Sequence, residues 1–467
     1  MSGWRVNAVR SKRRNPYRSG PGSSRSKLRR SRSAAFRRTA IRGNSYREGF
    51  EAGYREGVEF GIQNFRTYFE GTSIVIPTYN QLNMIKPCMD SIVQNTNVPY
   101  EIIVVDNAST DGTADYLRSL EGLVRFRLLE SNRGFAGAVN VGMMMAKGRT
   151  IMLLNNDTLV TKSWLENLLA CLNSDDKIGM VGPMTNYISG EQQIEVPYTN
   201  IADMPRFASE YNRSDPARWK RIDRLAGFCL LFRRELFEEI GYFDEGFDIG
   251  NFEDDDYNVR VRLLGRSLVM AQDTFIHHFG SVSMKALGDR YHEVNDRNQL
   301  YYMEKWHNPN EWIHQVREHE AMNPGVLPHS AVLYPERVVV QGIGENRYWI
   351  EQGMRRLVSG ELSVPAVRIS QIDLRRWPLG EPISAEEAES RWLGRDEESG
   401  WESGVAVLAD GRSFHVEGSR VREIIGEKAL ESWNLHLKPK KTISQEMLDT
   451  KIRWLPIIAS PLLRQVL

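Results

Sequence analysis

Acidic, amide and imidazole side chains gather at four places in the chain, each after a stretch that contains apolar residues. These groups are Asp106-Asn107, Asn155-Asn156-Asp157, Glu253-Asp254-Asp255-Asp256 and His277-His278. Carboxylates can hold a divalent cation, which stabilises the oxygens of a departing diphosphate. A carboxylate beside an acceptor hydroxyl can also take its proton. The side chains therefore suit the binding of a cation and the transfer of a proton.

The four consecutive acids at 253–256 form the most concentrated of these groups. A run of like charges is usually a solvated surface. This one follows the apolar and aromatic stretch Ile249–Phe252 and leads into Tyr257–Leu264, which has the pattern of an amphipathic helix. Acids at a helix N-terminus are favoured by the helix dipole. The pattern favours a functional carboxylate here, and the adjacent Asp254 and Asp255 leave its register open by one residue.

Short apolar runs alternate with helical patterns from Thr72 onward. The expected strands are Thr72–Pro77, Glu101–Asp106, Arg125–Leu129, Thr150–Leu154 and Asp273–Ile276, and the expected helices are Leu82–Asn95 and Gly137–Ala146. Alternating βαβ units imply a parallel sheet, whose ligands bind at the carboxyl ends of the strands. The polar groups fall at those ends, which indicates a nucleotide-type site.

The composition separates a basic start of this 467-residue chain from an acidic body. Fifteen Lys and Arg residues precede Glu48, which is the first acid, and the remainder carries a formal net charge of −14. Residues 1–46 are rich in Arg, Ser, Gly and Asn and poor in apolar residues, so we expect a disordered tail. The tail would bind an anionic partner such as nucleic acid, an acidic polysaccharide or an acidic protein, or it is a solvated tail with no single partner.

Two repeats flank the predicted sheet. In residues 47–70, copies of a near-repeat that begin at Tyr46 and Tyr54 place apolar residues every four positions, which predicts a helix. In residues 308–467, two related segments begin at Tyr348 and Phe414, each with an apolar run, a glycine turn and alternating basic and apolar residues. Both have the pattern of a β-hairpin, so we expect a small β-containing module for acceptor binding, assembly or packing.

The cysteines and the hydropathy of the chain indicate the cellular compartment in which the protein is made. Cys88, Cys171 and Cys229 stand far apart in apolar contexts, which predicts buried free thiols in a reducing compartment. No run approaches the roughly 18 apolar residues of a membrane span, and the start of the chain lacks an apolar signal segment. We therefore expect no transmembrane segment and synthesis in the cytoplasm.

Seven motifs occur in a fixed order between Ser73 and Trp306. They are IVIPTYN (Ile74–Asn80), IIVVDNASTDGT (Ile102–Thr113), NRGFAGAVNVG (Asn132–Gly142), LLNNDT (Leu153–Thr158), GFCLLFRRELFEEIGYFDEGF (Gly227–Phe247), FEDDDYNVR (Phe252–Arg260) and HFGSVS (His278–Ser283). With these motifs about half of the chain resembles the family 2 glycosyltransferases, of the branch that includes rhamnosyltransferase-like enzymes. The resemblance implies a GT-A fold at residues 71–307, that is, a Rossmann-like α/β fold with a mostly parallel sheet flanked by helices.

The resemblance also implies the reaction. It is an inverting, metal-dependent hexosyl transfer from a nucleotide-diphosphate sugar, UDP- or dTDP-linked, to a hydroxyl of a glycan or glycoconjugate acceptor. Bacterial polysaccharide or surface glycoconjugate synthesis is the expected setting. The tail and the 47–70 repeat resemble appendages on family members of spore-forming bacteria, which points to the inner membrane face or the spore surface.

Residues implied to bind the nucleotide sugar lie in the first five motifs. They are Pro77, Thr78, Asn80, Asp106, Asn132, Arg133, Gly134, Asn140, Asn155, Asn156 and Gly227. Asp106 resembles the family aspartate that accepts a hydrogen bond from the base. The glycine turn at Gly134 precedes a helix, whose N-terminus favours phosphate.

The implied metal ligands are Asp157 and His278. Asn155-Asn156-Asp157 occupies the place of the family's metal-binding Asp-x-Asp motif, with Asn155 in place of the first aspartate. Asp157 is then the main carboxylate for Mg²⁺ or Mn²⁺. The spacing His-x-Gly-Ser-x-Ser fits His278 better than His277.

The implied catalytic group is Glu253, Asp254 and Asp256. In the family's Glu-Asp-x-Asp pattern Asp254 is the general base, while Asp256 and Arg260 would support it. Two other functions remain open at this stage. The missing first aspartate is compatible with a non-catalytic scaffold, for example in spore or envelope assembly. The basic tail is compatible with nucleic-acid binding, although the acidic body lacks an RNA-binding motif.

Overall fold

A computed structural model describes residues 67–280, 288, 290–327, 329–394 and 403–464, together with residues 53, 55 and 59. The chain divides into two units, residues 1–69 and 70–467, and the second contains the features described below. The predicted tail at 1–46 and most of the predicted repeat at 47–70 lie outside the described residues.

An eight-stranded sheet forms the centre of the first half of this unit. Its strands are β1 (Phe69–Thr78), β2 (Tyr100–Asp106), β3 (Arg125–Leu128), β4 (Gly148–Leu154), β6 (Ile178–Met184), β7 (Trp219–Ile222), β8 (Cys229–Arg233) and β9 (Ser267–Phe275), in the order β3-β2-β1-β4-β8-β6-β9-β7. β1 pairs in parallel with β2, β2 with β3, and β6 with β9, while β8 runs antiparallel to both of its neighbours and β7 to β9. The predicted mostly parallel α/β sheet is confirmed.

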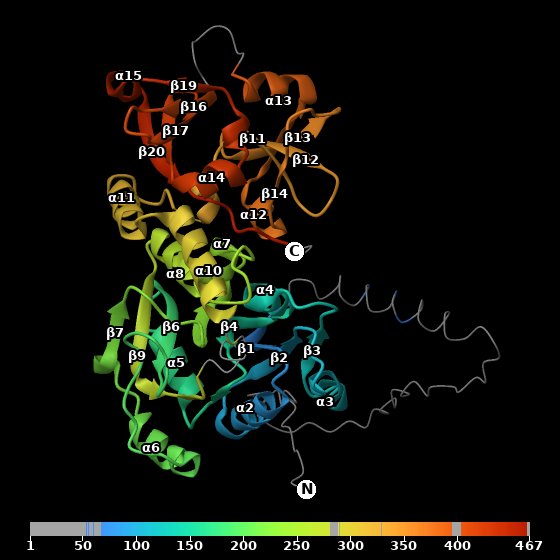
Figure 1. Ribbon diagram of the computed structural model, residues 1–467, viewed down its shortest axis with the longest axis vertical. Coiled ribbons are helices and arrows are strands. Elements are labelled where there is room, and N and C mark those ends of the chain that lie inside the picture. Colours follow the sequence, from blue (N-terminus) through green and yellow to red (C-terminus); the bar gives the residue numbers. More distant parts are fainter. Residues whose placement is uncertain are drawn as a thin grey trace, which may run out of the picture. The chain divides into compact units, whose positions relative to one another are not determined.

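Helices cover both faces of this sheet (Figure 1). They are α2 (Leu82–Asn95), α3 (Thr113–Ser119), α4 (Gly134–Met145), α5 (Trp164–Leu172), α6 (Met204–Tyr211), α7 (Arg234–Ile240) and α8 (Glu253–Leu263). Helix α10 (Arg290–Trp306) packs against the C-terminal part of the unit, and α11 (Pro309–Met322) packs against α8 and that part. Side chains alternate along a strand: Ile74 and Ile76 of β1 join an apolar cluster with α2, α3 and α5, whereas Val75 joins another with α4, α7 and α8. The continuous apolar runs in the sequence therefore reflect burial on two faces.

Two predicted boundaries were wrong by several residues. Helix α4 begins at Gly134 and not at Gly137, and the Asn132 side chain accepts the Gly134 N–H at 2.9 Å, which pairs one of the N–H groups left open in the first turn. The last strand begins at Ser267 and not at Asp273, because residues 267–271 pair with β6.

A separate two-stranded ribbon lies beside the sheet. β5 (Thr158–Leu159) pairs antiparallel with β10 (His277–His278), so that His278 stands opposite Thr158. Two segments that are distant in the chain thus meet directly after Asp157.

Two five-stranded sheets occupy the C-terminal part of the unit. The first contains β11 (Val338–Gln341), β12 (Arg347–Glu351), β13 (Met354–Ser359), β14 (Val367–Arg368) and β15 (Leu379–Ser384), and the second β16 (Ser403–Val407), β17 (Ser413–Glu417), β18 (Arg420–Ile424), β19 (Lys440–Thr442) and β20 (Ile452–Ile457). Their helices are α12 (Gln371–Arg376), α13 (Ala385–Trp392), α14 (Gly426–Ser432) and α15 (Gln445–Asp449). The two predicted hairpins are β12–β13 and β17–β18.

The two C-terminal sheets have the same topology. Their strand orders, β14-β11-β12-β13-β15 and β19-β16-β17-β18-β20, correspond strand for strand, with the same pattern of parallel and antiparallel pairs. In the first, Arg356 pairs with Glu351 and donates to the carbonyls of residues 381 and 382; in the second, Arg422 pairs with Glu417 and donates to those of residues 455 and 456. The likeness of the two sequence segments thus extends to side-chain contacts.

Packing continues across the predicted boundary at residue 307. One apolar cluster contains Val259 of α8, Trp306 of α10, Val340 of β11 and Val405 of β16. After β20 the chain returns to the first half, where the Leu462 N–H donates to Asp244 at 3.1 Å. Among the helices of the described residues, none is long and apolar enough to cross a membrane.

Candidate active site

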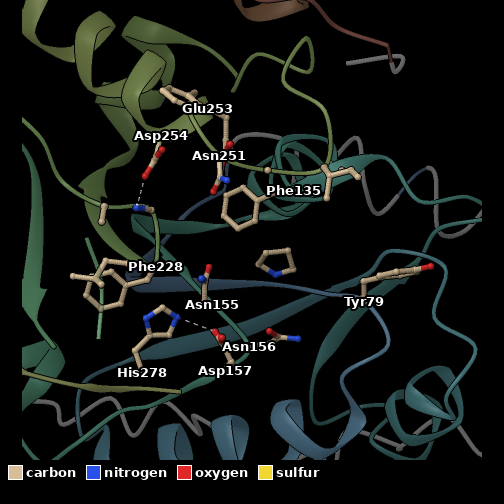
Figure 2. A pocket seen from close by; sticks show the side chains of 18 of the residues that line it. Tyr79, Phe135, Asn155, Asn156, Asp157, Phe228, Asn251, Glu253, Asp254 and His278 are labelled. Carbon is tan, nitrogen blue, oxygen red and sulfur yellow. Dashed lines mark hydrogen bonds and ion pairs between the residues drawn. The ribbon is translucent and has the colours of Figure 1, made fainter. Parts of the chain in front are cut away.

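A cavity of about 1010 Å³ opens at the carboxyl ends of the parallel strands. The predicted residues that line it are Pro77, Thr78, Asn80, Asn132, Gly134, Asn155, Asn156, Asp157, Gly227, Glu253, Asp254 and His278. Figure 2 shows Glu253 and Asp254 on one side of the opening, and Asp157 and His278 on the other. The volume is at the upper end of small-molecule sites, so the cavity has room for more than one substrate.

The strand ends fix a layer of amide and hydroxyl groups. Asn156 donates to the Thr78 hydroxyl at 2.7 Å, which joins the ends of β4 and β1. Asn107, after β2, donates to the side-chain oxygen Oδ1 of Asn132 at 2.9 Å, and its own Oδ1 accepts the Arg133 N–H at 2.8 Å. This layer presents oriented polar groups of the kind that bind a nucleoside.

Asp157 and His278 face each other inside the cavity wall. His278 Nδ1 lies 2.8 Å from the Tyr187 carbonyl oxygen, which only accepts, so Nδ1 carries a proton. His278 Nε2 then points at Asp157 Oδ1, 3.2 Å away, and makes no hydrogen bond among the described residues. The ring is buried and stacks on Phe228, with centroids 5.4 Å apart.

This arrangement fits a divalent cation. A neutral imidazole nitrogen and a carboxylate oxygen that point at each other both carry lone pairs, so a proton or a cation between them is needed to make the contact favourable. No cluster of three or more His, Cys, Asp or Glu side chains suited to a metal ion occurs within the described ranges. The donor's phosphates and water would therefore supply the other ligands, as is usual for Mg²⁺.

The opposite wall carries the acids at the start of α8. Asp254 Oδ2 accepts the Gly227 N–H at 2.7 Å, and an added Cβ at Gly227 would stand 3.1 Å from the Asp254 Cβ, a tight contact that would push on the Asp254 side chain. Asp255 forms an ion pair with Arg224 at 2.5 Å. Asp254 thus faces the cavity in a fixed orientation, and Asp255 is held by a cation.

Burial changes the acidity of the two neighbours of Asp254. Burial, together with the charge of Asp254, raises the pKa of Glu253 well above its ordinary value. The same two causes raise the pKa of Asp255 to about 6, although the charge of Arg224 opposes the change. Glu253 therefore retains its proton more readily than an ordinary surface glutamate.

Asp256 faces the protein interior. It pairs with Arg260 at 2.9 Å and with Lys305 at 2.6 Å, and all three side chains are fully buried. Burial alone would raise its pKa, but the charges of Lys305 and Arg260 lower it. Asp256 holds α8 against α10 and does not line the cavity, and its predicted role in support of Asp254 stays a prediction.

Three predicted nucleotide ligands also lie outside the lining. Asp106 is buried and accepts a hydrogen bond from the Ser109 N–H at 3.3 Å, and the next residue, Asn107, lines the cavity in its place. Asn140 is buried on α4 and binds the Phe243 backbone and Glu245. Arg133 contributes its backbone N–H to Asn107.

Several lining residues were not predicted. Tyr79, Phe135, Tyr187 and Phe228 add aromatic surface, Arg224 adds a cation, and α10 contributes Arg290, Tyr291 and Asn295. Tyr79, Phe135 and Phe228 lie within recognised motifs, where the apolar pattern is equally well explained by core packing, whereas Tyr187 lies between two motifs. The residues of α10 carry no pattern that sets them apart from an ordinary polar helix.

Residues 73–241 match the family model described as "Glycosyl transferase family 2". Relatives include the chondroitin synthase of Pasteurella multocida, 25% identical over 41% of this chain and 23% of that protein. Glycosyltransferase GlyG of Streptococcus pneumoniae is 28% identical over 43% of this chain and 68% of its own length, and the uncharacterized glycosyltransferase YwdF of Bacillus subtilis is 28% identical over 40% and 67%. Several matched relatives are much longer, and the chain spans less than a third of them.

Solved structures with a similar fold include GalNAc-T7 with UDP, GalNAc and Mn²⁺, at a TM-score of 0.39 and 19% identity, over 54% of this chain and 52% of that one. Another is the mannosyltransferase PcManGT from Pyrobaculum calidifontis, at a TM-score of 0.36 and 19% identity, over 61% and 88%. The family match agrees with the predicted GT-A fold, while the rhamnosyltransferase-like branch stays a prediction.

Proposed function

We propose that this chain is an inverting glycosyltransferase, because residues 73–241 match the model of glycosyl transferase family 2. It moves a sugar from a nucleoside diphosphate to an acceptor hydroxyl. One observation carries the proposal: a cavity at the strand ends has a cation-type pair, Asp157 and His278, on one wall and an oriented carboxylate, Asp254, on the other. Single-displacement transfer needs these two groups on opposite sides of the sugar.

The nucleoside binds the amide layer at the strand ends. Asn107, Asn132 and Thr78 supply donors and acceptors for base and ribose, and the half-exposed ring of Tyr79 offers a stacking surface. A UDP- or dTDP-sugar fits this layer equally well, because both bases present the same hydrogen-bonding edge. The polar groups are held by one another, so little ordering is needed when the donor binds.

Asp157 and His278 hold the cation that accompanies the diphosphate. When bound, a Mg²⁺ or Mn²⁺ ion acts as a Lewis acid that stabilises the negative charge of the leaving phosphate oxygens. Asn155 takes the place of a second carboxylate and can hydrogen-bond a ribose or sugar hydroxyl. With a single carboxylate in the site, the affinity for the free cation is expected to be modest.

Asp254 takes the proton from the acceptor. Its Oδ2 is held by the Gly227 N–H at 2.7 Å, which orients the carboxylate towards the cavity. The acceptor oxygen forms a bond to the sugar's anomeric carbon while the bond to the diphosphate oxygen breaks, and the hydroxyl proton passes to Asp254. Attack from the side opposite the diphosphate inverts the anomeric centre.

A glycan or glycoconjugate is the proposed acceptor, in polysaccharide or surface glycoconjugate synthesis. The relatives include proteins named chondroitin synthase and an O-antigen biosynthesis protein of Myxococcus xanthus. Arg290, Tyr291 and Asn295 of α10 line the cavity and offer the mixture of aromatic and polar groups that binds sugars. A non-catalytic scaffold is the alternative, which the replacement of the first aspartate by Asn155 keeps open.

The first experiment is a donor panel. Purified protein is incubated with UDP-, dTDP- and GDP-sugars in Mn²⁺, in Mg²⁺ and in EDTA, and release of nucleoside diphosphate is measured. We expect release from one donor class that depends on the cation, and loss of that release in Asp254→Asn. Silence across the panel, together with no nucleotide binding in calorimetry, would leave the scaffold as the better explanation.

A further inference from the structure

The loop that leads into the catalytic acids has a strained backbone. Ile249, Asn251 and Phe252 have positive φ angles of 61°, 79° and 71°, a region that residues with a Cβ rarely adopt and that is least favourable for a β-branched residue such as Ile249. All three residues line the cavity, and Glu253 follows directly. Strain of this kind persists only where the surrounding structure enforces it.

One buried side chain binds this loop at several points, in addition to the Phe135 N–H, which donates to the Ile249 carbonyl oxygen at 2.7 Å. Asn298 of α10 is 1% exposed, and its Nδ2 donates to the carbonyl oxygens of Asp248 at 2.8 Å, Gly250 at 2.8 Å and Asn251 at 3.2 Å. Its Oδ1 accepts the Asp248 N–H at 3.0 Å. A single amide therefore binds four backbone groups of a loop that lies about fifty residues earlier in the chain.

The C-terminal end of α10 binds the neighbouring first turn of α8. Lys305 Nζ lies 2.6 Å from Asp256 and 2.5 Å from Asp244, and the Trp306 indole N–H donates to Asp256 at 2.9 Å. Asn298 thus holds the loop before α8, while Lys305 and Trp306 hold the first turn of α8. Asp254 lies between these two points of attachment.

From this geometry we infer that Asn298 is a positioning residue for the transfer step. It keeps the strained loop 248–252 in the conformation that aims Asp254 into the cavity. The inference rests on the proposed function only for its effect on turnover; its effect on the loop is independent of any activity. Because the cation pair and the amide layer of the strand ends come from other elements, we expect loss of Asn298 to affect turnover far more than donor affinity.

The test compares Asn298→Ala and the nearly isosteric Asn298→Asp with a matched control, Asn167→Ala. Asn167 is also a buried amide on a helix, 4% exposed, and donates to the carbonyls of Asn212 and Asp273 at 3.3 and 3.2 Å, away from the cavity. Backbone hydrogen exchange over residues 247–256, donor affinity and kcat are measured at a temperature where every variant is folded. Asn298→Ser, which keeps one donor, is used if neither larger change gives folded protein.

We expect both Asn298 variants to speed exchange of the loop and to lower kcat by about 10- to 100-fold, the scale of a misplaced catalytic group, with donor affinity within about 3-fold of the parent. Asn298→Asp should be the worse variant, because it directs a carboxylate at three carbonyl oxygens. Unchanged loop exchange, or a fall in kcat no larger than that of Asn167→Ala, would overturn the inference. If the parent chain turned over no donor, the proposed function would fail, while the exchange experiment would still decide the role of Asn298.

Discussion

The two walls of the cavity are built in different ways. Asp157 and His278 are brought together by backbone pairing, because β5 follows Asp157 and β10 contains His278, and none of the residues from Asn155 to Leu159 has a positive φ. Asp254 instead follows a strained loop held by a side chain of another helix. We name the two walls after their proposed roles: the cation wall carries Asp157 and His278, and the base wall carries Asp254 and Asp255. The cation wall follows from strand pairing, whereas the base wall depends on a few specific side chains.

This difference predicts that single substitutions affect the base wall most strongly. Asp254→Asn keeps the size of the side chain and its bond from the Gly227 N–H but cannot accept the hydroxyl proton. We expect kcat to fall by about 10³-fold, within the usual range for loss of a general base, while donor affinity in calorimetry stays within about 3-fold. Asp255→Asn is the register control: if it abolished turnover and Asp254→Asn did not, the base would be Asp255.

Substitution of Asp256 should lower stability, in contrast to substitution of Asp254, which should lower turnover. Asp256→Asn removes the fully buried partner of Arg260 and Lys305 and leaves both cations with less compensation. We expect the free energy of unfolding to fall by about 3 kcal/mol, the lower end of the cost of breaking a buried ion pair, as measured by denaturant unfolding. Loss of turnover without loss of stability would instead give Asp256 a role in the chemistry.

The sequence was most informative where one element determines a residue's position. β-branched runs predicted the central strands, and the polar residues directly after them predicted Thr78, Asn156 and Asp157 in the cavity, because ligands bind where parallel strands end. The glycine turns of the two hairpins likewise predicted the two C-terminal repeats. In each case a local pattern contains the information.

Positions that depend on distant contacts could not be predicted. Asp106 and Asn107 are adjacent at a strand end, and only the fold shows that Asn107 lines the cavity. Asn140 has a helical position typical of either a ligand or a buried polar anchor, and its partners Phe243 and Glu245 lie a hundred residues away. Asn298 is one polar residue among many on α10, so the local sequence could not predict its four hydrogen bonds to the loop.

The cation wall should respond to metal concentration. Asp157→Asn keeps the shape of the side chain but removes the negative charge that faces His278 Nε2 at 3.2 Å. We expect the Mn²⁺ concentration for half-maximal turnover to rise by about 100-fold, and turnover to recover in part at saturating Mn²⁺. His278→Gln tests the same pair from the other side, and a metal response that neither variant alters would move the cation elsewhere in the cavity.

The smallest effect is expected at Asp255, whose buried carboxylate lowers the free energy of unfolding at neutral pH. Its pKa is about 6 in the folded chain, raised first by burial and then by the charge of Asp254, against about 3.9 for an unperturbed aspartate. Between these values the folded chain binds more protons than the unfolded chain. Linkage then requires that stability falls as pH rises from about 4 to 6 and stays reduced above 6.

Asp255→Asn removes this pH-dependent penalty. We expect the variant to be more stable than the parent at pH 7 by about 1 kcal/mol, a value reduced for the partial exposure of Asp255 and the loss of its pair with Arg224, and to lose this advantage at pH 4. Denaturant unfolding at both pH values measures the difference. A variant that is less stable at pH 7 would mean that the pair with Arg224 outweighs the burial of the carboxylate, so that the acids of the base wall would contribute to stability as well as to chemistry.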